Sequence, residues 1–318
     1  WLIGQENRGL EYMFIMMNAA RYAVGVQGVA IAERAYQKAV AYARDRVQSR
    51  PVDGSMNKSA PIIHHPDIKR MLMTMRAYTE GCRAMALVAA SAYDAAHHHP
   101  DAQARQQNAA FYEFLVPLIK GYSTEMSLDV ASLGVQVHGG MGFIEETGAA
   151  QYLRDARILT IYEGTTAIQA NDLVGRKTAR DGGQVARAIA GRIEATEAAL
   201  AQRSSAASKS MLKHLRAARA AFVEVVDFVA GSTKASPNAV FAGSVPYLML
   251  AGNVVAGWQM ARALIVAEDQ RAEDAAFMDA KVATARFYAE HILSKVPGVR
   301  DSIIEGHAAV NDMALEAF

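Results

Sequence analysis

The chain has 318 residues, of which 52% are hydrophobic and 20% charged, enough for a substantial core in one large or two ordinary domains. Its 33 Lys and Arg against 32 Asp and Glu give a net charge of +1. This balance argues against a nucleic-acid or membrane-surface partner, which would require a concentrated basic field. The single cysteine, Cys82, excludes an internal disulfide framework and fits a reducing, cytoplasmic compartment.

The ends and apolar stretches indicate neither a signal peptide nor a membrane helix. The N-terminal sequence WLIGQENRGL lacks a basic start followed by an apolar run, and it lacks an initial Met. We therefore expect the chain to begin partway through a larger protein. The best apolar stretch, Val245–Val255, is shorter than the roughly 18 residues that a membrane helix requires.

Apolar residues recur at spacings of three and four through most of the chain, which predicts an all-α protein. The first predicted helix runs from about Leu10 to Arg46. Its apolar stripe comprises Tyr12, Ile15, Met16, Ala19, Tyr22, Val26, Val29 and Ala32. Gly25 and Gly28 would allow a neighbouring helix to approach closely, which favours a helical bundle.

Two more long helices are predicted after the loop Ser49–Pro61. The second runs from Pro66 to about His99 and ends in the triple His97–His99, which we interpret as a solvated helix end. Adjacent histidines on a helix point in different directions, so we expect no metal site there. The third helix runs from Asp101 to about Val137, and Pro117 is expected to kink it.

A carboxylate at a joint between two helices is the strongest candidate for chemistry. After a predicted helix over Glu146–Leu159, Glu163 precedes Gly164, and Thr165 or Thr166 is placed to cap the next helix. By itself, an acid here could simply be a first-turn residue favoured by the helix dipole.

The surrounding motifs favour a catalytic role. The run Leu153–Arg157, followed by Ile161–Thr166 and then Ile168-Gln169, resembles the signature of the acyl-CoA dehydrogenase family. The resemblance implies a four-helix bundle for residues 1–177. It also implies that Glu163, beside Gly164 at the substrate, is the base that removes the α-proton of an acyl-CoA thioester while hydride passes to FAD. Burial in a dry pocket is expected to tune such a base.

Two further motifs resemble FAD-contacting elements of the family. Gln136–Phe143 is similar to the Gln-x-x-Gly-Gly-x-Gly-Phe element, which assigns Gln136, Gly139 and Gly140 to the adenine-nucleotide half of a FAD held mainly by a neighbouring subunit. Glycine backbone N–H groups suit a pyrophosphate. Tyr42–Gln48 resembles the helix end at which Arg46 contacts the pyrophosphate, and Gln48 lies beside it.

Other expectations rest on the same resemblance. Asn18 and Arg21 would face the acyl-CoA, and Thr165 would contact the flavin. The sequence also departs from the common pattern, because Ser49-Arg50 replaces Phe-Gly and Ala167 replaces a Gln. These changes put an adenine contact and a flavin contact in question, and Arg50 is a candidate extra phosphate ligand.

The remaining sequence, residues 178–318, is predicted as a helical C-terminal extension typical of a long subfamily. Its expected helices are Gly183–Arg203, Ser210–Val229, Val240–Glu268 and Ala272–Leu293. The resemblance implies a homodimer or tetramer with electron-transfer flavoprotein as acceptor. In the family, an N-terminal helical domain and a middle β-domain precede the part seen here, so the isolated chain is expected to be inactive and to bind FAD poorly.

Three alternatives remain at the level of sequence. The apolar helices could form a non-catalytic oligomerisation module. The chain could be a relative of the family's DNA-binding alkylation-response branch, although the mixed charges of residues 178–318 disfavour that reading. Within the enzyme class, an acyl-CoA oxidase is also open.

Overall fold

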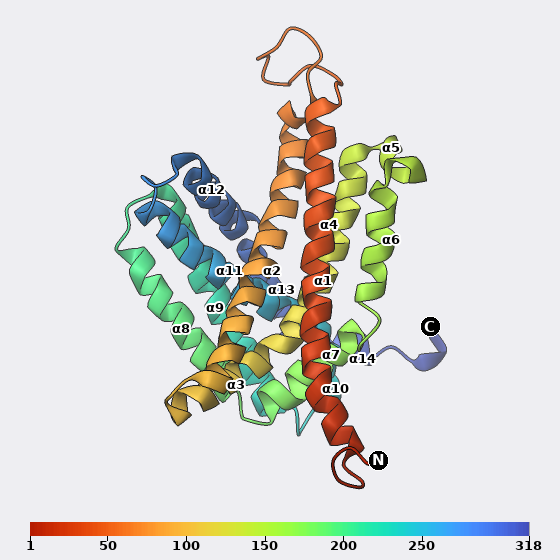
Figure 1. Ribbon diagram of the computed structural model, residues 1–318, viewed down its shortest axis with the longest axis vertical. Helices are drawn as coiled ribbons and strands as arrows, with labels where there is room; N and C mark the ends of the chain where they lie inside the picture. Colours follow the sequence, from red (N-terminus) through yellow and green to blue (C-terminus); the bar gives the residue numbers. More distant parts are fainter. Residues whose placement is uncertain (318) are drawn as a thin grey trace.

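The computed structural model describes residues 1–317, and all regular elements in that range are helical (Figure 1). The longer helices are α1 (Gly9–Asp45), α2 (Pro66–His98), α3 (Ala102–Pro117), α4 (Ser123–His138), α6 (Ala149–Leu159), α7 (Thr166–Val174), α8 (Gln184–Ala201), α9 (Ala206–Ser232), α11 (Ser244–Asp269), α12 (Ala275–His291) and α13 (Val296–Ile304). Shorter helices are α5 (Gly140–Phe143), α10 (Pro237–Ala242) and α14 (His307–Asn311), with single turns at 62–64, 145–147, 293–295 and 315–317. The predicted all-α class is confirmed.

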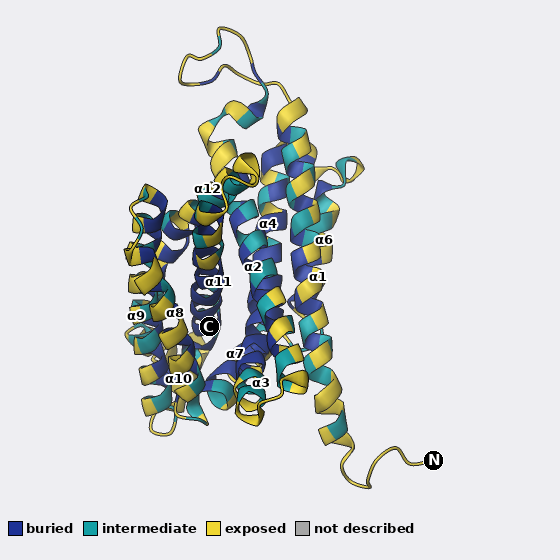
Figure 2. Cartoon of the chain, turned by 60° about the vertical axis from the view of Figure 1, so that its left-hand side comes forward, coloured by how far each residue is buried: buried dark blue, intermediate teal, exposed yellow. Residues whose placement is uncertain are grey.

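Helices α1, α2, α4 and α6 lie side by side as the expected bundle (Figures 1 and 2). Alanines line the buried side of the second half of α1, and they face apolar side chains of the other three helices. This core comprises Ala32, Ala35, Ala39, Ala43, Ile62, Met71, Leu72, Met75, Val130, Ala131, Val137 and Ala156. Small side chains on α1 let its neighbours pack closely, and the buried alkyl groups stabilise the bundle through the hydrophobic effect.

The first half of α1 does not bury the stripe that its spacing predicted. Ile15, Met16 and Val26 are exposed, and the buried side carries Val24, Gly25 and Gly28 instead. The two glycines decide the orientation: a Cβ on Gly25 would lie 2.4 Å from the Ile119 carbonyl oxygen. Close backbone contact at Gly25 and Gly28 therefore leaves Val26 on the outer side, whereas no residue from 9 to 20 is buried on any side of the helix.

The predicted third helix is continuous through Pro117 but changes its hydrogen bonding there. Helix α3 passes into a π-helical turn, η2 (Leu118–Tyr122), which leads directly into α4. Proline removes a backbone donor and crowds the preceding turn, which a widened π-turn accommodates without a break. All five residues of η2 are buried.

Residues 178–317 pack against the bundle around α11. Apolar residues from α2, α3, η2 and α7 share one core with residues of α8, α9, α11, α12 and α13. The single helix expected over Val240–Glu268 is instead α10 and α11, which meet at Gly243, and helices α13 and α14 were not predicted. The division into domains 1–177 and 178–318 stays a prediction.

Two helices are longer and more apolar than the sequence analysis expected. By length and composition alone, α1 and α11 are candidate membrane spans, so the prediction that no stretch qualifies is wrong. Figure 2 shows why this is weak evidence for α11, which is surrounded by other helices; 67% of its apolar window is buried inside the protein.

Candidate functional site

The joint after α6 has a left-handed backbone. Within this hinge, defined as Thr160–Thr166, Glu163 has φ +54° and Gly164 has φ +93°. Thr165 caps α7 as predicted, and its hydroxyl oxygen accepts the Ile168 N–H at 3.4 Å. A non-glycine residue in the left-handed region costs about 1–2 kcal/mol, so surrounding contacts have to hold Glu163 there.

Buried polar side chains supply those contacts. The Lys120 Nζ donates to the Gly164 carbonyl oxygen at 2.5 Å, and the Gln169 Nε2 donates to the Glu163 carbonyl oxygen at 3.5 Å. Both side chains are 0% exposed. The Thr166 hydroxyl donates to the Glu125 carboxylate, which ties the start of α7 to α4. The hinge is thus fixed from its inner side. Sequence patterns did not single out Lys120 or Glu125, whereas Gln169 and Thr166 belong to the run that resembles the family signature.

Lys120 comes from the π-helical turn η2 and is the most unusual of these residues. Burial lowers its pKa to about 8, and the nearby Glu125 and Glu163 carboxylates oppose that shift. A lone Lys within the apolar run LVPLIKGY was the available sequence signal, since lysine is almost never fully buried without a partner.

Glu163 itself is exposed in residues 1–317, so the expectation that this chain sequesters it is wrong. Apolar residues close to Glu163 in the sequence are also open to solvent. Ile158, Ile161 and Ile168 are 52%, 46% and 47% exposed. An exposed apolar surface around a single acid is typical of a binding site that another molecule or segment covers.

The two predicted substrate residues lie one helical turn apart on α1. Asn18 is half-buried, whereas Arg21 is buried and its Nη1 lies 3.3 Å from Asp172 Oδ2 of α7. Asp172 also binds Arg176, with Oδ1 2.5 Å from Nε. Within the described residues, Arg21 Nε is buried without a hydrogen-bond partner. Arg21 therefore links α1 to α7 and keeps one donor free.

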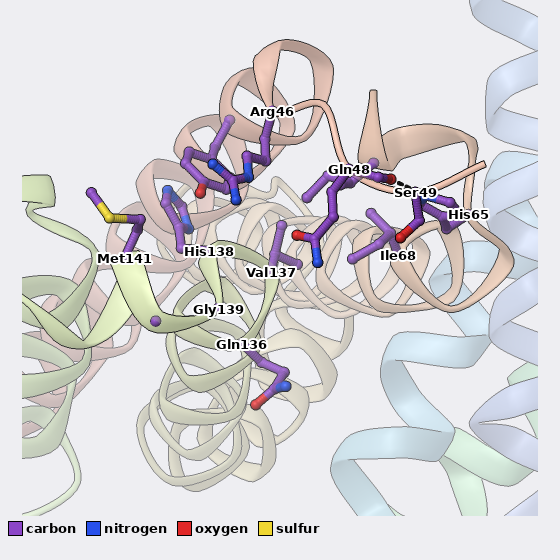
Figure 3. A pocket seen from close by; sticks show the side chains of 13 residues that line it. Arg46, Gln48, Ser49, His65, Ile68, Gln136, Val137, His138, Gly139 and Met141 are labelled. Carbon is purple, nitrogen blue, oxygen red and sulfur yellow. Dashed lines mark hydrogen bonds between the residues drawn. The ribbon is translucent and has the colours of Figure 1, made fainter. Parts of the chain in front are cut away.

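A separate pocket of about 550 Å³ lies where α1, α4 and α5 meet (Figure 3). Its lining includes five of the six residues predicted to contact FAD, namely Arg46, Gln48, Gln136, Gly139 and Gly140, whereas the sixth, Thr165, lies at the hinge. The structure therefore brings two distant sequence motifs to one cavity. Figure 3 shows the Gln136 side chain extending away from Arg46, so its amide does not converge with the guanidinium.

The glycine turn of this pocket is open. Gly139 has φ +61°, and a Cβ added to Gly139 or Gly140 would meet nothing within 4 Å. The free space beside backbone N–H groups and a cationic Arg46 fits a phosphate-bearing ligand such as the nucleotide half of FAD. These residues would hold its charged and polar groups.

Sequence reasoning missed aromatic and histidine side chains that line the same pocket. Tyr42 stacks on His138 with ring centroids 4.3 Å apart. His138 Nδ1 is 2.7 Å from the Gly134 carbonyl oxygen, and burial lowers the pKa of its imidazole. His65 Nε2 lies 2.8 Å from the Gln48 carbonyl oxygen. Because each belongs to an ordinary helical pattern, spacing alone could not identify them.

Comparison with known proteins relates these features to one family. A family model described as "Acyl-CoA dehydrogenase, C-terminal domain" matches residues 7–177, and "Acetyl-CoA dehydrogenase C-terminal like" matches residues 189–314. The chain is 55% identical, over 96% of its length, to 3-methylmercaptopropionyl-CoA dehydrogenase of Ruegeria pomeroyi. It is 34% identical, over 95% of its length, to the broad-specificity linear acyl-CoA dehydrogenase FadE5 of Mycobacterium tuberculosis.

The chain spans about half the length of these curated relatives, 53% and 52% respectively. The same proportion holds for a crystal structure of an acyl-CoA dehydrogenase complexed with FAD from Bacillus anthracis. That structure superposes with a TM-score of 0.73 at 19% identity, over 99% of this chain and 52% of the other. At that identity the likeness establishes the fold.

Proposed function

The chain belongs to the acyl-CoA dehydrogenase family, and we propose on that premise that its protein catalyses FAD-dependent α,β-dehydrogenation of an acyl-CoA thioester to the trans-2-enoyl-CoA. The observation that carries the proposal is the hinge. The backbone of Glu163 is held in a left-handed conformation by buried polar side chains, and exposed isoleucines lie close to it in the sequence. The chain thus presents a pre-positioned acid on an apolar surface.

Glu163 would remove the α-proton of the thioester. A base for so weak a carbon acid needs water excluded around it, because water competes for the proton and screens the developing charge. The apolar surface at Ile158, Ile161 and Ile168 would provide the lower wall of a dry site once covered. The cover has to come from the acyl chain, from the flavin or from protein outside residues 1–317.

Arg21, Asn18 and Gly164 are proposed to orient the acyl-CoA. The free Nε of Arg21 is a buried donor suited to an acceptor on a ligand, and the Asp172 pair fixes the guanidinium in place. Gly164 has no side chain to obstruct approach to the hinge backbone. Thr165, exposed at the start of α7, would contact the flavin.

FAD would supply the hydride acceptor, and the Arg46 pocket would hold a nucleotide portion of it. The residues that line the pocket precede α6 in the chain, whereas Glu163 follows its end. We propose that the two sites serve different FAD molecules, with the pocket gripping one held mainly by a neighbouring copy. This arrangement requires a homodimer or tetramer.

The remaining partner assignments are also proposals. One relative carries the name caffeyl-CoA reductase-Etf complex subunit CarC, from Acetobacterium woodii, which supports electron-transfer flavoprotein as the acceptor. Cys82 is a free, buried cysteine, and burial raises the pKa of its thiol to about 12. A free thiol suits a reducing compartment, which supports a cytoplasmic location.

The test is Glu163→Gln in the full-length protein. Removal of the base is expected to slow bleaching of the bound flavin by acyl-CoA by about 10²–10⁴-fold, while the flavin content stays unchanged. Anaerobic stopped-flow absorbance measures the bleaching rate, and the visible spectrum gives the flavin content. Glu113→Gln, which removes an exposed acid paired with Lys177, is the matched control. A normal bleaching rate in Glu163→Gln would refute the assignment.

A further inference from the structure

Lys120 is a fully buried cation whose hydrogen bond ends one residue from the proposed base. Its Nζ donates to the Gly164 carbonyl oxygen at 2.5 Å. Taking an ammonium out of water is costly, so a lysine at this depth persists only when specific acceptors and charges compensate it. The acceptor here is a backbone oxygen of the hinge, which makes the hinge the element that Lys120 acts on.

The hinge needs such support. Glu163 and Gly164 are consecutive residues with positive φ, and their carbonyl oxygens accept hydrogen bonds from Gln169 and Lys120 respectively. The Lys120 bond is the shorter of the two, and a cationic donor makes it the stronger one. Loss of this bond would leave the Gly164 carbonyl free to rotate and would release the left-handed backbone at Glu163.

Lys120 is itself fixed by the C-terminal helices. Two residues further along η2, the Tyr122 hydroxyl donates to Asn253 Oδ1 at 2.8 Å and lies 3.1 Å from the Tyr288 hydroxyl. The Tyr122 ring lies against Gly252, where an added Cβ would come within 2.2 Å of it. The π-helical turn therefore has a fixed position, set by α11 and α12, from which Lys120 reaches the hinge.

We propose that Lys120 is a positioning residue for the reaction: by binding the Gly164 carbonyl oxygen, it fixes the backbone of Glu163 and so the direction of the carboxylate. The inference rests on the proposed function, because it assigns Lys120 a task only if Glu163 is the base. It also implies that helices α11 and α12 contribute to the reaction indirectly, because they fix the position of the π-helical turn that carries Lys120.

The experiment compares Lys120→Met with wild type in the full-length, flavin-loaded protein. Methionine keeps an unbranched side chain of similar length without the donor. The bleaching rate at saturating acyl-CoA is expected to fall about 10–100-fold, while the KM for acyl-CoA and the flavin content stay near wild type and the melting temperature does not fall. Lys177→Met, which removes a partly buried lysine paired with Glu113, should leave all four quantities unchanged.

The outcomes separate the two proposals. A normal rate in Lys120→Met, or a rate loss matched by loss of flavin or of thermal stability, overturns the positioning role. If Glu163→Gln bleaches normally, the proposed function fails regardless of Lys120. If only Glu163→Gln is slow, the function stands and the role of Lys120 falls. Should Lys120→Met not fold, Lys120→Leu, which also lacks a donor, is judged by the same rate-against-KM criterion.

Discussion

The hinge at Glu163 and the glycine turn at Gly139 both contain residues with positive φ, yet their surroundings differ. At the hinge, the backbone carbonyls bind buried side chains, and a Cβ on Gly164 would come within 2.7 Å of Gln169 Nε2. At the turn, a Cβ on Gly139 or Gly140 would meet nothing within 4 Å. The hinge is therefore supported by contacts within the chain, whereas the glycine turn borders unoccupied space.

This difference indicates how each segment contributes to function. Residues that act on a bond have to be placed before the substrate arrives, and internal contacts provide that placement. A segment that holds a nucleotide gains its contacts from the ligand, so open space beside it is useful. We therefore expect substitutions in the hinge to change rates and stability, and substitutions in the pocket to change affinity.

Alanine in place of glycine gives the largest expected contrast. Gly164→Ala puts a side chain at φ +93° against a buried amide and is expected to cost about 2 kcal/mol of unfolding free energy. Gly140→Ala, at a position with open space, should change it by less than about 0.5 kcal/mol. Chemical denaturation of the two variants measures both values. Equal losses would remove the contrast between the segments.

Arg46→Met tests the affinity side of the comparison. Loss of the cation that lines the pocket is expected to weaken FAD binding about tenfold, which corresponds to about 1.4 kcal/mol. The bleaching rate of the fraction that retains flavin should not change. Arg44→Met is the control for FAD titrations, because Arg44 is an exposed arginine two residues earlier that does not line the pocket. A slower rate with unaltered affinity would contradict the assignment.

The pH dependence of stability sharpens the view of the hinge. Burial lowers the pKa of Lys120 from 10.5 to about 8, so between these values the unfolded state binds more protons than the folded state. The contribution of Lys120 to the unfolding free energy is therefore fully present above pH 10.5 and is lost as the pH falls through about 8. Denaturant unfolding at pH 7 to 10 should show a more positive slope for wild type than for Lys120→Met. Parallel curves would mean that Lys120 titrates normally.

Much of the hinge could be predicted from local chemistry. A glycine permits the unusual backbone, a threonine caps the following helix, and both features can be identified from a few adjacent residues. The long helices were predictable for a similar reason, since their apolar spacing and end signals are local. Thr165 and the start of α2 at Pro66 are confirmed as expected.

The support of the hinge could not be predicted in the same way. Lys120 and Gln169 reach it from a π-helical turn 44 residues away and from the next helix, so their role depends on tertiary packing. Likewise, spacing placed Val26 on the buried side of α1, but the close approach at Gly25 and Gly28 leaves it exposed, although Val29 and Ala32 of the same stripe are buried. Spacing identifies the sides of a helix, and the partner decides which side is buried.

The contact between Tyr122 and Gly252 has a consequence for chain length. A protein shortened after residue 177 would uncover a wholly buried aromatic ring and leave its hydroxyl without either amide or phenol neighbour. Residues 178–317 thus cover part of the interior, and without them buried apolar residues of α3 and of the π-helical turn would face solvent.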